Sequence, residues 1–373
     1  MRVQIVDPSA YTPPYDHALC AALARAGATV ELITSAFAYG ALPPPDGYAV
    51  HERFYRYALG APGSRLRRAS KLLAHVPDML AYRRVAAAAD VVHFQWLALQ
   101  WLDARLLPAR PVVLTAHDLL PREPRPGQAR AQRALYAAVD AVVVHSQYAR
   151  SQLAGELGVA AEKVHVIPHG AFAHLTRQPA DAPLPAELAG ATGATGATGA
   201  VALFFGLLRP YKGIGTLLQA WRGIEDAELW IVGRPRMSLE PLRSAAPPNV
   251  RFVPRFVSDA ELWACFRRAD LVVLPYTRTE RFDQSGVLAT ALAFGKPAVL
   301  TDVGGFAEVA ATGAARLVAP DDPDALRDAL AGLLGAPEER ARRAQAALAA
   351  ARGQYSWDHA AERTLALYRS LVG

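Results

Sequence analysis

The chain has 373 residues, of which 52% are hydrophobic and 20% are charged. This length suits two domains, and the composition fills hydrophobic cores, which excludes a disordered chain. Lys and Arg number 40 against 34 Asp and Glu. Because this charge is spread along the chain and only four of the cations are lysines, we attribute the arginine bias to a GC-rich genome and expect no nucleic-acid partner.

Cysteine usage and hydropathy place the chain in a reducing compartment. Cys20 and Cys265 lie far apart in apolar stretches, which excludes a disulfide framework and a cysteine metal site. The apolar run Val3–Val6 is too short for a signal peptide. The uncharged stretch 188–208 is half Gly-Ala-Thr, a poor membrane span and a good linker. The sequence therefore predicts a cytoplasmic protein that spans no membrane.

Short apolar runs alternate with helical patterns from one end of the chain to the other. Most of these runs are continuously apolar, as expected for parallel strands covered on both faces. A repeated strand–helix pattern implies an α/β fold with parallel sheets and right-handed crossovers. The expected strands are Val3–Val6, Val30–Thr34, Val91–Phe94, Val112–Thr115, Ala141–His145, Val164–Ile167, Val201–Phe205, Leu229–Val232, Val250–Val253, Leu271–Leu274, Ala298–Leu300 and Leu317–Ala319.

A change of composition divides these strands into two sets of equal number. Residues 179–200 are rich in Pro, Ala and Gly and end in Gly-Ala-Thr repeats, which cannot pack a core. We expect an amino-terminal domain over 1–178, a linker over 179–200 and a carboxy-terminal domain over 201–354. Because ligands bind beyond the carboxyl ends of parallel strands, we expect the two sheets to face a shared cleft.

A basic amphipathic segment covers residues 64–85 and is expected to form two short helices on either side of Pro77. Such a segment can lie on an anionic membrane surface. An ordinary surface helix with a solvated charged face is the alternative. The prediction is a cytoplasmic protein, or one that is peripheral on the inner face of the membrane. The cations of the segment 64–85 are Arg65, Arg67, Arg68 and Lys71, and the leucines among and after them are Leu66, Leu72 and Leu73.

Two histidines directly follow expected strands. His117 stands beside Asp118, and a histidine at a strand end can exchange hydrogen bonds with a ligand. A structural histidine bonded to the backbone is the alternative there. His169 stands before Gly170, whose freedom permits a tight turn, and a structural turn is the favoured interpretation.

The loop after Val201–Phe205 carries the densest set of polar residues. Arg209 offers a planar fork and Lys212 a point charge, and both lie between Gly206 and Gly213 at the start of a helix. Helix N-termini favour anions, so this combination suits a diphosphate. A solvated surface pair is the alternative.

A turn of small residues, Ser285-Gly286, opens an apolar helix whose first backbone N–H groups are free to bind a ligand. The nearby Gly295-Lys296 is followed by Pro297 rather than Ser or Thr, which excludes a Walker motif. No G-x-G-x-x-G follows a strand and no H-E-x-x-H is present, so we expect neither a dinucleotide cofactor nor a metal.

Several of these segments together resemble retaining glycosyltransferases of family 4 (glycosyl transferases group 1). Because the spacing between the segments also matches, the resemblance covers nearly all of the second half. It implies the GT-B architecture, two Rossmann-like domains facing a central cleft, with a closing helix over 355–373 that crosses back to the first domain. The matching segments are Phe205–Gly213, Leu229–Gly233, Ala269–Pro275 and Thr301–Glu308, and less specifically Thr115–Asp118 and Val164–Gly170.

The resemblance implies transfer of a sugar from a nucleotide-diphosphate sugar to a glycan, lipid-linked or small-molecule acceptor. The anomeric configuration is retained and neither metal nor cofactor takes part. The physical basis is electrostatic stabilisation of the departing diphosphate. By resemblance, Arg209 and Lys212 hold the diphosphate and His117 contacts the donor sugar. The implied donor-binding residues are Gly206, Phe256, Val257, Gln284, Ser285, Gly286, Val287 and Thr290.

The chain departs from the family pattern in two places. The family has two glutamates eight positions apart, whereas this chain has Phe282 and Thr290 there. Asp283 is our expected replacement for the first carboxylate, with Glu280 as the alternative. A threonine can bond a ribose hydroxyl but cannot grip the diol with two oxygens. The first strand–helix loop also carries a proline pair in place of the usual glycine pair.

Two other functions fit the same architecture. One is a non-catalytic nucleotide-sugar-binding protein, suggested by the missing glutamates. The other is a nucleotide-sugar epimerase or hydrolase, which would turn over the donor without an acceptor. A phosphorylase with pyridoxal phosphate is disfavoured because only four lysines are present. The sequence therefore predicts a retaining hexosyltransferase, with these two functions as alternatives.

Overall fold

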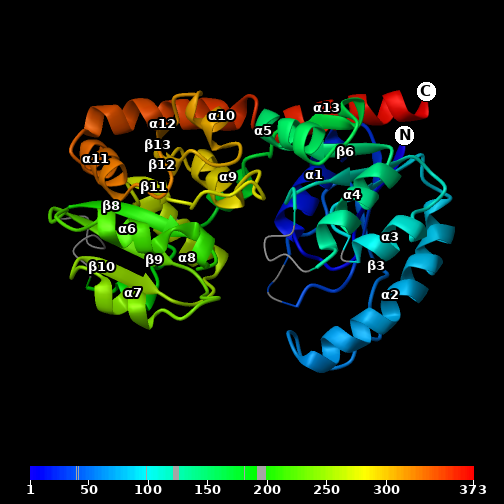
Figure 1. Ribbon diagram of the computed structural model, residues 1–373, viewed down its shortest axis with the longest axis horizontal. Coiled ribbons are helices and arrows are strands. Elements are labelled where there is room, and N and C mark those ends of the chain that lie inside the picture. The colour runs from blue at the N-terminus through cyan, green and yellow to red at the C-terminus, as the bar shows by residue number, and fades with distance from the viewer. Residues whose placement is uncertain (39, 41, 98, 121–125, 180, 191–198) are drawn as a thin grey trace. The chain divides into compact units, whose positions relative to one another are not determined.

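The computed structural model describes residues 1–38, 40, 42–97, 99–120, 126–179, 181–190 and 199–373 (Figure 1). They form two compact units. The first contains Met1–Gly170, Arg281–Asp283 and Trp357–Gly373, and the second contains Ala171–Glu280 and Gln284–Ser356. Residues 191–198, which hold most of the Gly-Ala-Thr repeats of the expected linker, lie outside the described residues.

The first unit is built on a parallel sheet of seven strands in the order β3-β2-β1-β4-β5-β6-β7. Six of these strands are predicted by the sequence. The prediction missed β3, because this edge strand is partly exposed and lacks a continuous apolar run. The strands are β1 Arg2–Asp7, β2 Thr29–Thr34, β3 Ala49–Glu52, β4 Val91–Phe94, β5 Val112–Thr115, β6 Ala141–Val144 and β7 Val164–Val166.

Helices cover this first sheet, and α13 packs against α1 (Figure 1). The expected break at Pro77 is wrong, because α2 is one continuous helix that contains Pro77. His75 and Met79 are buried on either side of Pro77, so packing outweighs the backbone bond that a proline removes. The helices are α1 Pro13–Arg25, α2 Arg65–Ala86, α3 Gln100–Leu106, α4 Gln128–Ala138, α5 Gln147–Ser151 and α13 Trp357–Val372, with short turns at Gln152–Glu156 and Ala161–Lys163.

The second unit is built on a parallel sheet of six strands in the order β10-β9-β8-β11-β12-β13. All six overlap expected strands, although β13 begins two residues before the expected Leu317–Ala319 and ends one residue earlier. The strands are β8 Ala200–Phe205, β9 Ala227–Val232, β10 Val250–Val253, β11 Leu271–Leu274, β12 Ala298–Thr301 and β13 Ala315–Val318. The helices are α6 Ile214–Ala220, α7 Glu240–Ala245, α8 Asp259–Arg268, α9 Gly286–Ala293, α10 Phe306–Ala310, α11 Pro323–Leu334 and α12 Pro337–Arg352, with short turns at Ala173–Thr176, Ala186–Leu188 and Pro210–Lys212.

Strand order reverses once in each sheet, between β1 and β4 in the first and between β8 and β11 in the second. Loops that leave neighbouring strands in opposite directions open a crevice at the carboxyl edge, which is where ligands bind in such sheets. A ligand site is therefore expected in the loops that follow these four strands. The parallel α/β fold expected from the sequence is confirmed.

Two segments outside the main body of the expected domains, one in the expected linker and one in α13, are packed into the two units. Within the expected linker, Leu188 is fully buried in the second unit, and Glu187 Oε1 accepts a hydrogen bond from Arg255 Nε at 2.8 Å. At the end of the chain, Tyr368 on α13 is fully buried in the first unit, with its hydroxyl 2.6 Å from His93 Nδ1. Within the described parts of the chain, none of the helices combines the length and hydrophobicity that a bilayer crossing requires.

Candidate active site

Close backbone contacts hold the loop between β8 and α6 in the second unit. Gly213 has φ = +68°, and a Cβ at this position would lie 1.7 Å from Pro275 O, so only glycine fits. Thr277 N donates to Tyr211 O at 2.9 Å. The loop that carries Arg209 and Lys212 is thus fixed against the loop that follows β11.

Lys212 is only 6% exposed, and its ammonium lies 4.9 Å from the centre of the Tyr276 ring. The Tyr276 hydroxyl is 3.1 Å from Ser285 Oγ. A Cβ at Gly206 would lie 3.0 Å from Lys212 Nζ and 3.1 Å from Val287 Cγ2. The structure therefore brings four of the expected donor-site residues together, and it leaves the space beside the ammonium free of a side chain at Gly206.

The turn before α9 supplies backbone groups to the same cluster. Ser285 precedes the first residue of α9, so the first N–H groups of that helix have no partner within it. Gln284 Nε2 donates to Gly305 O at 3.1 Å, which ties the turn to the start of α10. This arrangement places a helix N-terminus and an ammonium beside one another, and both attract an anion.

The residues expected to contact the nucleoside lie in two places of the second unit. Thr290 is 5% exposed, and its hydroxyl donates to Gly286 O at 2.9 Å. Because the proton is used within the helix, the oxygen can only accept from a ribose hydroxyl. After β10, Phe256 is 66% exposed and Val257 is 6% exposed.

Ion pairs fix the segment around Phe256. Arg255 bonds both Glu187 and Glu261, with an Nη2–Oε1 distance of 2.6 Å to Glu261. These hydrogen bonds lower the pKa of Glu261 to about 2, so its carboxylate stays ionised at neutral pH. Ser258 caps α8 through the same glutamate. The exposed Phe256 ring therefore projects from a backbone that is held on both sides.

His117, in the first unit, directly follows β5 and is held on every side. Its ring stacks on Trp96 with a centroid distance of 5.0 Å and an interplanar angle of 14°. Its Nε2 lies 3.1 Å from Gln95 Oε1, and its Nδ1 lies 3.5 Å from His145 Nε2. Gln95 and Trp96 follow β4, so two loops at the switch point of the sheet orient this imidazole.

The hydrogen bonds of His145 fix a proton on His117. Burial lowers the pKa of His145 to about 4, so this ring is neutral at pH 7. Its Nδ1 donates to Ile167 O at 3.0 Å, which leaves Nε2 as a lone pair facing His117. His117 Nδ1 therefore carries the proton between the two rings, and His117 Nε2 is an acceptor. The Gln95 amide satisfies it when turned so that its Nε2, which is buried and has no other hydrogen-bond partner among the described residues, faces the ring.

Asp283 is fully buried in the first unit. Its Oδ2 accepts from His145 N at 2.7 Å and its Oδ1 accepts from Ser146 Oγ at 2.5 Å. The neighbouring Arg281 O accepts from Leu119 N at 3.2 Å. Asp283 thus fixes the backbone of His145, whose imidazole contacts His117. Glu280, the alternative carboxylate, is exposed.

Tyr15 on α1 lies at the centre of an aromatic cluster behind His117. Its ring centroid is 4.7 Å from that of His117, 5.0 Å from that of His169 and 4.9 Å from that of Trp357. Burial lowers the pKa of His169 to about 3, and His169 Nδ1 lies 2.9 Å from Gly170 O. His169 is thus a neutral packing residue, consistent with the turn expected there.

Sequence reasoning missed Tyr276, Gln95, Trp96 and Tyr15. The first three follow strand ends, and that position was the signal available for them. Tyr15 lies inside a helix and only the fold brings it to the site. A cavity of about 120 Å³ adjoins this region and is lined by Gln95, Trp96, Thr115 and His117 among others.

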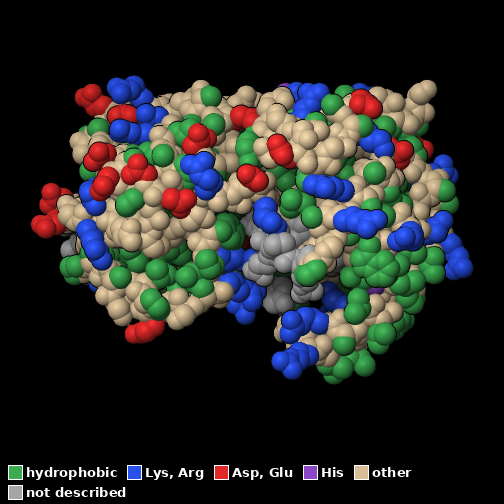
Figure 2. Space-filling view, in the orientation of Figure 1, with side chains coloured by type: hydrophobic (Ala, Val, Ile, Leu, Met, Phe, Trp, Pro, Cys, Tyr) green, Lys and Arg blue, Asp and Glu red, His purple; other side chains and the backbone are tan. Residues whose placement is uncertain are grey.

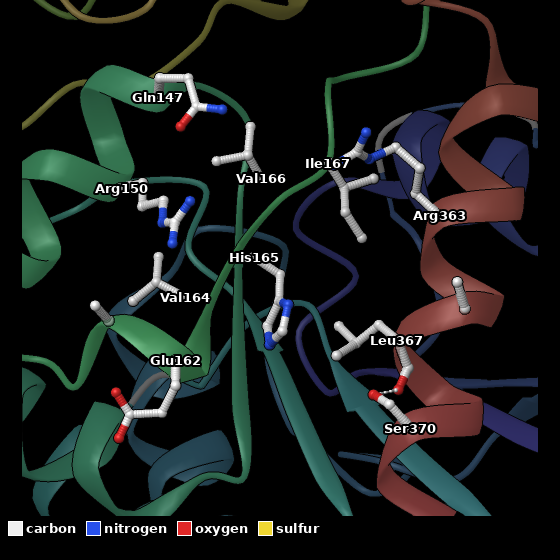
Figure 3. A pocket seen from close by; sticks show the side chains of 12 residues that line it. Gln147, Arg150, Glu162, Val164, His165, Val166, Ile167, Arg363, Leu367 and Ser370 are labelled. Atoms are coloured by element: carbon white, nitrogen blue, oxygen red, sulfur yellow. Dashed lines mark hydrogen bonds between the residues drawn. The ribbon is translucent and has the colours of Figure 1, made fainter.

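A larger cavity of about 420 Å³ lies elsewhere in the first unit, beside the edge strand β7 (Figure 3). Figure 3 shows Arg150 on one side, Arg363 of α13 on the other and His165 between them. None of the site residues expected from the sequence lines it. It follows the length of an edge strand rather than the carboxyl ends of the sheet, so size alone does not make it the active site.

Among the described residues, no three or more His, Cys, Asp or Glu side chains are arranged to hold a metal ion. The second unit offers an ammonium, a guanidinium and a helix N-terminus, and the first unit, taken by itself, offers an oriented imidazole. Cations and N–H groups of this kind stabilise a diphosphate leaving group.

Comparison with known proteins identifies the family. Residues 15–171 match the model for glycosyltransferase family 4, and residues 199–336 match the model for glycosyl transferases group 1. The D-inositol 3-phosphate glycosyltransferase 1 of Catenulispora acidiphila is 31% identical over 317 residues, covering 76% of this chain and 72% of that protein.

Solved structures share the fold over the whole chain. Sucrose-phosphate synthase from Thermosynechococcus elongatus has a TM-score of 0.76 at 20% identity, covering 100% of this chain and 99% of that one. Anabaena HepE in complex with UDP-glucose has a TM-score of 0.74 at 20% identity, covering 100% of both chains. The chain belongs to glycosyltransferase family 4 and is a retaining hexosyltransferase of GT-B fold that transfers a sugar from a nucleotide sugar.

Proposed function

We propose that Arg209 and Lys212 bind the diphosphate of the donor together with the first N–H groups of α9. The buried ammonium of Lys212 beside Gly206, Ser285 and Val287 is the observation that carries this assignment. An ammonium that is already desolvated and held against a tyrosine ring needs little reorganisation when negative charge develops on the leaving group.

The remaining donor contacts follow from the same loops. The exposed Phe256 ring and the backbone at Val257 meet the base, and the oxygen of Thr290 accepts from the ribose. Gln284, Ser285 and Gly286 contribute groups to the sugar and phosphates. The solved relative HepE is described with UDP-glucose, which supports a nucleoside-diphosphate hexose as the donor.

His117 is proposed to contact the donor sugar, and Asp283 to serve as the carboxylate behind it. Asp283 acts as a positioning residue, because it accepts from the backbone of His145 and from Ser146. His145 in turn accepts from His117 Nδ1. This series of hydrogen bonds fixes the imidazole of His117, so that the sugar is held in one orientation while its bond to the diphosphate breaks.

The test of the donor site is Lys212→Ala. We expect the release of nucleoside diphosphate during sugar transfer to fall by more than ~100-fold, about 2.7 kcal/mol, since the developing charge loses one of its two proposed cations. The assay uses a panel of UDP- and GDP-hexoses with a set of acceptors. Lys163→Ala is the matched control, because Lys163 bonds backbone carbonyls of Ala137 and Val139 in the first unit. Turnover of Lys212→Ala at the wild-type rate would contradict the assignment of Lys212 to the diphosphate.

We also propose that α2 contacts an anionic membrane. Leu66, Leu73 and Leu80 recur every second turn of α2 and are 58%, 79% and 45% exposed. Arg65 and Arg68 are exposed near the same end of the helix. Figure 2 shows Lys and Arg side chains beside hydrophobic ones at this end of α2. An exposed apolar stripe flanked by cations suits the interface of an anionic bilayer.

The four cations expected to contact the membrane differ in exposure, since two are exposed and two are half-buried. Arg67 is half-buried, and its Nη1 donates to Ala58 O at 3.2 Å and Gly60 O at 3.3 Å. Lys71 is half-buried against Tyr55. Only Arg65 and Arg68 are free to meet lipid headgroups, so the proposed membrane contact rests on these two and on the leucine stripe.

A further inference from the structure

The edge strand β7 has backbone groups that point away from the rest of the first sheet. β7 is the outermost strand of that sheet and pairs with β6. Ile167 N donates to Val144 O at 2.8 Å, and successive residues of a strand direct their backbone groups to opposite sides, so the N–H and C=O of Val166 face away from β6. The N–H of Val164 faces the same way and is bonded to Ala161 O. Among the described residues, the N–H and C=O of Val166 have no hydrogen-bond partner, so β7 can receive a further strand.

Two helices form the walls of the cavity that runs along β7 (Figure 3). One wall is α5, with Gln147 and Arg150, and the other is α13, with Arg363, Leu367 and Ser370. We call the space between these residues and β7 the β7 groove. Its volume of about 420 Å³ lies within the range of about 300–1,000 Å³ that ligand pockets occupy. A free strand edge between two walls is the setting in which an extended peptide adds a strand to a sheet.

Both walls of the β7 groove carry a cation. Arg150 and Arg363 are exposed, and neither guanidinium forms an ion pair or a hydrogen bond with a described residue. Glu162, the acidic residue of the lining, lies at the opposite end of the groove from Arg363 (Figure 3). Burial and the charge of Arg150 lower the pKa of His165, so this ring is neutral at pH 7 and the two guanidiniums dominate the charge of the groove.

The position of these two cations favours one class of occupant. Successive side chains of an added strand point alternately to the two walls, so two neighbouring carboxylates would meet Arg150 and Arg363, one each. A guanidinium binds a carboxylate through two parallel hydrogen bonds. A second copy of this chain, paired through its own β7, would instead bring two more arginines into the groove, and like charges oppose such pairing. The groove therefore suits an acidic segment better than a second copy.

We propose that the β7 groove binds an extended acidic peptide segment of a partner protein, which extends the first sheet as its new edge strand. The backbone of the segment bonds the N–H and C=O of Val166, and two neighbouring carboxylates bond Arg150 and Arg363. None of the residues proposed to bind the donor lines the groove. Binding of the segment is therefore independent of the proposed function.

The test uses the hexapeptide Thr-Val-Glu-Glu-Val-Thr, with a fluorophore at one end and an amide at the other. Its binding is measured by fluorescence anisotropy with UDP and GDP in excess, and Lys212→Ala should bind it as the wild type does. Two altered peptides should bind at least tenfold more weakly, one with Gln-Gln at its centre and one that is N-methylated throughout. The N-methylated peptide keeps both carboxylates and lacks backbone N–H groups. Equal binding of all three peptides overturns the proposal.

Variants of the walls test the two cations. Arg150→Gln and Arg363→Gln should each weaken binding of the acidic peptide at least fivefold, since each removes one guanidinium from a carboxylate. Arg369→Gln is the matched control, because Arg369 is an exposed cation on α13 that does not line the groove, and it should leave binding unchanged. An equal effect of all three changes would contradict the proposal.

Val166→Pro tests the strand edge. Proline removes the N–H that faces away from β6 and keeps the bonds between β6 and β7, as edge strands tolerate. Peptide binding should fall at least tenfold in Val166→Pro and less than threefold in Val166→Ala, which retains the N–H.

Hydrogen exchange on the wild type covers the case in which Val166→Pro fails to fold. The acidic peptide should slow exchange of the Val166 amide, and unchanged exchange at saturation would contradict strand addition. A wild type that is dimeric without peptide and becomes monomeric as Val166→Pro would identify a second copy as the occupant and overturn the proposal.

Discussion

Asp7 and Asp16 form a pair of buried carboxyls beneath the first strand–helix loop. They are 0% and 1% exposed and hydrogen-bonded to one another. Burial raises the pKa of both, and the charge of Asp7 raises the pKa of Asp16 further. Two carboxylates in contact cannot both ionise cheaply, so the pair retains a proton well above pH 4.

This pair makes stability depend on pH in a definite direction. Because the folded pKa of Asp16 is above its unfolded value, its favourable contribution is complete at low pH and is lost as pH rises through the folded pKa. Asp16→Asn replaces the shared proton by an amide N–H that still donates to Asp7. We expect the variant to match or exceed wild-type stability at pH 8, by about 1 kcal/mol or more, with a flatter profile from pH 5 to 8.

Urea unfolding at several pH values measures this effect. Asp358→Asn is the control, because Asp358 forms an exposed ion pair with Arg25 and such pairs contribute about 0–1 kcal/mol. A loss of stability at pH 8 in Asp16→Asn, greater than at pH 5, would show that the buried carboxyl is ionised.

Asp283 is a buried carboxylate that accepts two hydrogen bonds in the first unit. Asp283→Asn presents one acceptor where Asp283 presents two, towards His145 N and Ser146 Oγ. We expect transfer to fall at least tenfold through kcat while donor affinity, measured by calorimetry, changes little. Glu280→Gln, at an exposed position, should leave both unchanged. If Glu280→Gln impairs transfer more than Asp283→Asn does, Glu280 is the functional carboxylate.

At the scale of elements, strands were predictable where burial on both faces leaves a continuous apolar run. The wholly buried β4, β5, β11 and β12 show this pattern. β3 does not, because an edge strand needs no such run. The Arg209–Lys212 loop was predictable because its residues are adjacent in sequence, whereas the support of Lys212 by Tyr276 and of His117 by His145 depends on contacts between distant segments.

The continuity of α2 has a consequence for membrane binding. With no break at Pro77, Leu66, Leu73 and Leu80 form one stripe over the whole helix. We expect the protein to co-sediment with anionic vesicles at low salt and to be released at high salt. The combined change Arg65→Glu/Arg68→Glu should abolish binding, since each cation contributes about 1 kcal/mol near an anionic surface.

Arg83→Glu/Arg84→Glu is the matched control at the other end of α2, where both side chains are also exposed. It should reduce binding less than the change at Arg65 and Arg68 does. Equal and negligible sedimentation with anionic and neutral vesicles would remove the membrane proposal.

For the whole molecule, acidification should weaken the two units unequally. Burial lowers the pKa of His93, His145 and His169, all in the first unit, to about 3, 4 and 3. These rings stay neutral in the folded state while the unfolded chain takes up protons below about pH 6.5. Each therefore contributes stability that is lost as pH falls from about 6.5 towards its folded pKa.

The free cysteines can report this difference, since each unit contains one that is fully buried, Cys20 in the first and Cys265 in the second. In the Asp16→Asn background, which removes an opposing contribution, pulsed maleimide labelling at pH 5 should modify Cys20 at a lower urea concentration than at pH 7. Cys265 should shift less, because burial lowers the pKa of only one described histidine, His174, in its unit. Equal shifts at both cysteines would contradict unequal weakening.

The place of α13 in the first unit also bears on the order in which the protein is made. Residues 1–170 are translated before the second unit, but Tyr368, which bonds His93 in the first unit, is translated after it. At about 5–20 residues per second, the first unit waits for its final helix for tens of seconds at the slower rates. Until α13 has been translated, α1 lacks the helix that packs against it, so the second unit can complete its sheet before the first unit completes its layer of helices.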